Sequence, residues 1–244
     1  MPTLILHLLR ARLRGWRLVG AAALVLFQPA VSMLAILTGP ELTGNLGAER
    51  IMTSVIGTGV FLGTAMVMMS ASTLRDERDD HTIGYLALTP LRRWKLAVAT
   101  VVAAVTACIT LALVSSIGIG IVGLFVGAGS VGVESLAYTI PAAIGYGSVS
   151  ALVGYLAPRG LLVMLFYVFV WEGLAGTLVP LAGNTSLQRI SLSVYGAIAD
   201  LPRIGMEIMA PIVSGAGGGM AKLLVTALVA TTVLWQVLVR RDLV

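Results

Sequence analysis

Apolar blocks, each long enough to cross a lipid bilayer, constrain the fold of this chain more than any other feature. A helix needs about 20 mostly apolar residues to span the hydrocarbon core. Only 11% of the residues are charged and the mean hydropathy is +0.98, so the chain cannot surround a water-soluble core with charge. These features predict an all-α integral membrane protein with six transmembrane helices, at residues 18–38, 51–72, 96–123, 135–157, 161–182 and 219–239.

The basic residues predict how these spans are oriented. With the N-terminus inside the cell, 12 of the 16 lysines and arginines fall in cytoplasmic segments, and the other four are Arg50, Arg189, Arg203 and Lys222. The opposite orientation would contradict the excess of Lys and Arg in cytoplasmic loops. We therefore expect a multi-pass protein of the plasma (inner) membrane, with both termini and residues 74–95 in the cytoplasm. The same positions explain the net charge of +5 without nucleic acid as a partner.

Two segments are predicted to lie at the membrane surfaces. Residues 1–17 form one amphipathic helix along the cytoplasmic interface, its basic face towards lipid phosphates or an acidic partner; the alternative is a simple topology signal. Residues 183–218 are apolar for a loop, and we expect short extracellular helices that re-enter the membrane between the last two spans. Backbone at that depth is buried in protein or lines a wet cavity, so this segment is a candidate lid.

Patterns typical of catalysis or metal binding are absent from the apolar blocks. The two histidines, His7 and His81, are far apart in sequence, and no predicted span carries a His/Glu pair at the helical spacing of a metal site. The glycine run before Lys222 lacks the spacing and the final Ser or Thr of a phosphate-binding loop. We therefore expect no enzyme activity in this chain, and no metal or cofactor bound by it.

Glu172 is the one clear carboxylate inside a predicted span. Its burial at a helix centre costs roughly 2.5–3.5 kcal/mol, so its side chain should face a cavity or a partner. A role in a substrate pathway, a structural hydrogen bond between helices and a shifted span near water are all open. Met66, Met69 and Phe169 complete the candidate pathway. The methionines suit an adaptable apolar wall or a soft-metal path, and ordinary packing is the alternative.

A glycine pair in the second predicted span indicates close helix packing. Gly59 and Gly63 have the GxxxG spacing, which lets the backbones of two membrane helices approach closely. A contact between two protomers is one use of such a pair.

The densest charge in the chain lies between the second and third predicted spans. Nine of the 22 residues in 74–95 are charged. An aspartate pair can cap a short helix, Ile83 and Leu86 supply one apolar face, and Pro90 ends the helix. Arg93 and its basic neighbours then begin the third span. An ordered apolar face between two charge clusters favours a docked helix over a plain loop.

This segment resembles the loop between the second and third spans in permease subunits of type-2 ABC exporters. That loop commonly contains a Glu-Arg pair, then Gly-Thr-Leu-Glu, a Thr/Ser-Pro turn and a closing Arg. The matching residues here are Glu77, Arg78, Thr82, Ile83, Thr89, Pro90 and Arg93. His81 replaces the usual Gly, and Gly84 replaces the usual Glu.

The resemblance covers nearly the whole chain and implies its architecture, partners and function. It implies a single permease domain over residues 1–244, with a cytoplasmic coupling helix in residues 76–93. A separate ATPase subunit, present in two copies, would dock there and bind the ATP and Mg. A second permease, identical or related, and membrane lipid would be the other partners. The implied coupling residues are Glu77, Arg78, Thr82, Ile83, Leu86, Pro90 and Arg93.

The chemistry of the spans favours an amphipathic or lipophilic substrate. A largely apolar interior with one glutamate suits a drug, an antibiotic or a lipid-like molecule, cations included. Two other classes compete with an exporter. A non-transporting sensor or immunity subunit would share the whole architecture. An intramembrane enzyme would require a catalytic pair at matching depth, which the spans lack, and a metal bound opposite Glu172 would revive that class.

Overall fold

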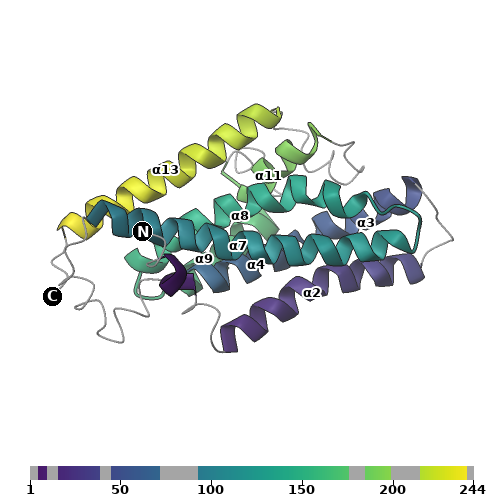
Figure 1. Ribbon diagram of the computed structural model, residues 1–244, viewed down its shortest axis with the longest axis horizontal. Coiled ribbons are helices and arrows are strands. Elements are labelled where there is room, and N and C mark those ends of the chain that lie inside the picture. The colour runs from purple at the N-terminus through teal and green to yellow at the C-terminus, as the bar shows by residue number, and fades with distance from the viewer. Residues whose placement is uncertain are drawn as a thin grey trace.

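The computed structural model describes most of the 244-residue chain. The described residues are 5–9, 16–38, 45–71, 93–175, 185–198 and 215–240. In these ranges all regular structure is helical and no strand occurs, which confirms the all-α class. The longer elements (Figure 1) are α2 (Trp16–Leu37), α3 (Asn45–Gly57), α4 (Gly59–Ser70), α7 (Arg93–Leu124), α8 (Val131–Leu156), α9 (Gly160–Phe166), the π-helix η1 (Tyr167–Ala175), α11 (Leu187–Tyr195) and α13 (Ala216–Arg240).

Several of these helices are long and apolar enough to cross a membrane. Within the described ranges, α2, α7, α8 and α13 each meet this condition, and α3 with α4 meets it as a pair bent by 48°. The predicted span at 161–182 corresponds to α9 and η1, and residues 176–182 lie outside the described residues. The chain is therefore a multi-pass helical protein with four or five spans described, and the count of six stays a prediction.

Helices α7 and α8 form a central hairpin. The turn between them contains Gly127 with φ +71°, a left-handed conformation that glycine adopts without steric cost. A Cβ atom on Gly132 would lie 2.6 Å from the Cα of Gly120, and one on Gly147 would lie 2.9 Å from the Cα of Val105. Because main-chain atoms cannot move aside, these glycines let the two backbones pack directly against each other.

Helices α2 and α13 lie on opposite sides of this hairpin (Figure 1). In the apolar stretches of α7 and α8, 56% and 61% of residues are buried, against 28% in α2 and 22% in α13. The flanking helices consequently keep large apolar side chains on the surface, including Leu26, Leu34, Leu224, Leu228 and Trp235. Such surfaces suit contact with lipid hydrocarbon, whose polarity they match.

The described N-terminal segment packs beside the beginning of α7. Leu8 of the short helix at residues 5–9 is buried against Ala99 and Ala103 of α7. The C-terminal end of α13 lies at the same end of the bundle, whereas the α7–α8 turn lies at the opposite end (Figure 1). This arrangement is what the predicted topology requires, because that topology places both terminal segments on one side. The assignment of that side to the cytoplasm stays a prediction.

Replacing Gly154 of α8 tests the close packing of this bundle. A Cβ atom there would overlap the carbonyl oxygen of Ala71 and lie 2.8 Å from its Cα, whereas Gly217 of α13 has nothing within 4 Å. We expect Gly154→Ala to lower the free energy of unfolding by about 1–3 kcal/mol, as overpacking does. Gly217→Ala should leave it equal or higher, because alanine favours the helix. Unfolding midpoints in detergent measure both, and equal midpoints would contradict the packing.

Candidate functional site

The π-helical segment η1 brings three polar side chains to one side of its span. In an α-helix residues five apart point about 140° away from each other, because each residue turns the helix by about 100°. In a π-helix the i→i+5 hydrogen bonds bring such residues close to one face. Tyr167, Trp171 and Glu172 of η1 accordingly all contact residues at or just before the start of α11. π-helical turns occur frequently at functional sites.

Glu172 binds the N-terminus of α11 directly. Its Oε1 atom accepts hydrogen bonds from the backbone N–H groups of Leu187 (2.8 Å) and Gln188 (3.2 Å). The first N–H groups of a helix have no partners within the helix and carry partial positive charge. The carboxylate is only 5% exposed, so these bonds compensate its removal from water.

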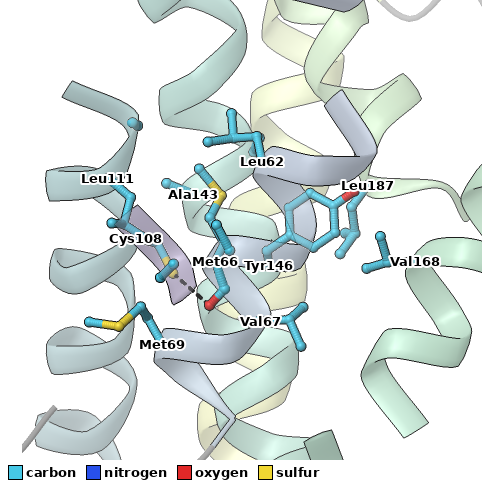
Figure 2. Close-up of a cluster of buried hydrophobic side chains, with 14 of the residues drawn as sticks. Leu62, Met66, Val67, Met69, Cys108, Leu111, Ala143, Tyr146, Val168 and Leu187 are labelled. Carbon is cyan, nitrogen blue, oxygen red and sulfur yellow. Dashed lines mark hydrogen bonds between the residues drawn. The ribbon is translucent and has the colours of Figure 1, made fainter. Parts of the chain in front are cut away.

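Tyr146 of α8 supplies a third donor to the same carboxylate. Its hydroxyl donates to Oε2 of Glu172. Figure 2 shows the Tyr146 ring in the buried cluster with Met66, Val168 and Leu187. The Glu172 side chain therefore connects η1, α8 and α11 in one buried contact.

The residues just before α11 are fixed by η1 as well. The Tyr167 hydroxyl donates to the carbonyl oxygen of Thr185 at 2.9 Å, and Nε1 of Trp171 donates to the Thr185 hydroxyl at 3.1 Å. Ser186 is the N-cap residue, and its Oγ accepts from the backbone N–H of Arg189 at 3.2 Å. A side-chain oxygen at this position stabilises the first helical turn.

The bend between α3 and α4 is held by two glutamine side chains. Gln28 of α2 donates through Nε2 to the carbonyl oxygen of Val55 at 2.9 Å, and Gln188 of α11 donates to that of Ile56 at 3.1 Å. Carbonyl oxygens beside a helix break need such partners, because lipid offers none. Gln188 thus ties the bend to α11, whose N-terminus is bound to Glu172.

The two glycines of the GxxxG pair pack against α8 of the same chain. A Cβ atom on Gly63 would lie 2.9 Å from Cζ of Tyr146. One on Gly59 would overlap the Tyr138 hydroxyl and lie 2.6 Å from Nε2 of Gln188. The close approach that this spacing permits is therefore made within the chain, beside the Glu172 site.

The structure places the other predicted pathway residues in different surroundings. Met66 and Met69 are buried in the apolar cluster of Figure 2, where the Cys108 thiol donates to the Met66 carbonyl oxygen at 3.5 Å. Phe169 is 50% exposed on the surface of η1. The pathway roles of these residues stay predictions. Among the described residues no group of His, Cys, Asp or Glu has the arrangement of a metal site.

Of the predicted coupling residues, Arg93 is the one that the described ranges include. Its Nη1 donates to the carbonyl oxygens of Leu238 (2.9 Å) and Val239 (2.8 Å) at the end of α13. The last carbonyls of a helix lack partners and attract cations. The remaining residues lie outside the described part of the chain: Glu77, Arg78, Thr82, Ile83, Leu86 and Pro90.

Sequence reasoning did not select Tyr146, Gln28 or Gln188 as site residues. Gln28 carried a usable signal, because an amide inside an apolar block must find a hydrogen-bond partner. Tyr146 and Gln188 carried no comparable signal, since their partners come from elements far away in the sequence.

A comparison with protein families gives one match of direct relevance. A family model described as an ABC-2 family transporter protein matches residues 11–182. This range contains α2 to η1 and the charged segment at 74–95, and it precedes α11 and α13. No curated protein and no solved structure matches the chain.

Replacing Glu172 tests whether it anchors α11. Glu172→Leu removes the acceptor of three donors, so we expect a loss of roughly 1.5–3 kcal/mol of stability, the usual worth of a hydrogen bond to a charged group. Hydrogen–deuterium exchange at residues 187–195 should become faster than in the unmodified protein. Glu134→Leu is the matched control, because Glu134 is half-buried in the first turn of α8. Unchanged exchange of α11 in Glu172→Leu would contradict the anchoring role.

Proposed function

The chain belongs to the ABC-2 transporter family as a membrane permease, and from this membership we propose that it is the permease subunit of an ATP-driven exporter. It forms the pathway together with a second permease, identical or related. Permeases of this family generally work with an ATPase subunit, and we propose two copies of it, which bind the ATP and Mg. The matched range, residues 11–182, and the multi-pass helical bundle support this assignment.

The Arg93 contact is the observation that best supports ATPase coupling through residues 76–93. This segment follows α4 in the chain and leads directly into α7, where Arg93 binds the last carbonyls of α13. A force applied to the segment would therefore act on α4, α7 and α13 together. ATP can bias a conformational equilibrium only through contacts that differ between the states, and we assign those contacts to residues 76–93.

The bend at the other end of α4 offers a route from this segment to α11. Gln188 joins the Ile56 carbonyl oxygen beside the bend to the start of α11, which Glu172 also binds. In our proposal α11 belongs to the extracellular lid and moves when the bend between α3 and α4 opens or straightens. Helix breaks absorb backbone changes of this kind in hinge motions.

The proposed substrate is an amphipathic or lipophilic compound, such as a drug, an antibiotic or a lipid-like molecule. The apolar cluster around Met66 and Met69 supports this class, because methionine adapts its shape to varied apolar partners. The exposed aromatic side chains of η1, Phe169 and Trp171, provide a further apolar surface. A non-transporting sensor or immunity subunit is the alternative function.

Co-purification and transport test this proposal. The permease isolated from its native membrane should carry an ATPase subunit, and the two together in vesicles should export a fluorescent lipophilic amphipath when ATP is added. A stable complex that hydrolyses ATP but moves no compound would favour the sensor or immunity function.

Charge reversal tests the coupling segment. We expect Glu77→Arg and Arg93→Glu each to lower transport per ATP hydrolysed by about tenfold, within the range of coupling free energies between sites. Arg159→Glu is the matched control, because Arg159 is an exposed arginine in the turn between α8 and α9. The Glu77→Arg and Arg93→Glu variants should still insert in the membrane as the unmodified protein does. Normal transport by both reversals would refute the proposed docking segment.

A further inference from the structure

Arg189 of α11 is a buried cation without a hydrogen-bond partner. Its side chain is 5% exposed, and within the described residues its Nη1 atom is shielded from water and bound to no acceptor. Arginine stays protonated at every physiological pH. Buried charges in proteins are normally paired or hold a ligand, since an isolated one is strongly unfavourable. The guanidinium charge is therefore not compensated by an acceptor among the described residues.

The other faces of α11 are occupied by contacts within the bundle. Leu187 and Ile190 pack into the apolar cluster with α8, and Gln188 binds the bend between α3 and α4. Residues four apart share a helix face, so Arg189 lies on the same side as Ser193, whose hydroxyl borders Gly219 of α13. Leu192, three residues after Arg189, packs with residues of α3. Arg189 therefore leaves α11 on the face between α13 and α3.

No carboxylate among the described residues neutralises this charge. These residues include three glutamates, Glu49, Glu134 and Glu172. Glu172 directs both carboxylate oxygens at Tyr146 and the first N–H groups of α11. Glu49 is exposed on α3, and Glu134 is half-buried in the first turn of α8.

We propose that Arg189 binds an oxyanion, a phosphate or carboxylate group, on the face of α11 between α13 and α3. A guanidinium presents parallel N–H donors that match two oxygens of such a group. An acidic lipid head group and a free phosphate are the two sources of such an oxyanion.

The site rests on the buried guanidinium and does not depend on transport. Binding is measured without ATP and without a partner ATPase. The oxyanion site can therefore fail this test while the proposed export holds, and export can fail while the site holds. The full chain is purified in neutral detergent and stripped of lipid. It is then titrated with dilauroyl phosphatidic acid, with the uncharged dilauroylglycerol of the same chains, and with inorganic phosphate.

The unmodified protein should bind phosphatidic acid about tenfold or more tightly than dilauroylglycerol, as expected for a hydrogen bond to a charged group. Arg189→Gln should abolish this preference, and Arg189→Lys should keep part of it. Arg50→Gln, which removes a half-buried arginine of α3, should keep all of it. Competition by inorganic phosphate alone would identify a free anion, and a response confined to phosphatidic acid would identify the head group of an amphipath.

A stability measurement separates binding from a structural role of Arg189. In the stripped protein Arg189→Met should unfold at the same or a higher temperature, because it removes an unpaired buried charge. Phosphatidic acid should then raise the unfolding temperature of the unmodified protein and leave that of Arg189→Met unchanged. An equal response of both proteins to every anion would overturn the proposal. A lower unfolding temperature for Arg189→Met would also overturn the proposal if Asp200→Asn or Glu207→Gln lowered it as well. That result would identify an internal ion pair of Arg189.

Discussion

The carboxylate of Glu172 at the start of α11 is the interaction on which this end of the bundle depends. A helix of nine residues is too short to be stable alone, and α11 is buried along nearly its whole length. Its first N–H groups would be unsatisfied in an apolar environment without an acceptor. One buried carboxylate solves this problem for α11. The three donors in turn satisfy the buried carboxyl oxygens of Glu172.

Two kinds of contact divide the bundle into a stiff part and an adjustable part. Along α7 and α8 the glycine contacts are between main-chain atoms, which cannot yield. At the bend between α3 and α4, by contrast, the carbonyl oxygens are bound by the flexible side chains of Gln28 and Gln188. Side-chain amides can exchange one acceptor for another without breaking a helix. Conformational change in a permease of this build is therefore easier at the bend than in the central hairpin.

The sequence predicted the class and most of the spans because these depend on block length and hydropathy alone. The all-α class is confirmed, and the family resemblance carried by residues 74–95 is confirmed by the family match over residues 11–182. The position of Glu172 in a span showed that it needs a partner. Its partners could not be predicted, because they depend on the π-helical register of η1 and on the backbone of α11.

Contacts between distant segments were equally hidden from sequence reasoning. The GxxxG spacing predicted a close approach, and the structure supplies its partner, α8 of the same chain. Arg93 was selected from a local motif, yet its acceptors lie 145 and 146 residues later. In the sequence Arg189 is one of four basic residues that the predicted topology places on the outer side. Its missing acceptor becomes visible only when the packing of α11 is known.

The π-helical segment also makes the length of this part of the chain more critical than its composition. Most side chains of η1 could be exchanged for others of similar polarity without changing where Glu172 points. Deleting one residue between Tyr167 and Glu172 would leave them four positions apart, a separation at which an α-helix also places two side chains on one face. Deleting a second residue would turn Glu172 by about 100° relative to Tyr167, because each residue of an α-helix adds that rotation. The carboxylate would then leave the N-terminus of α11, so this contact tolerates the loss of one residue but not of two.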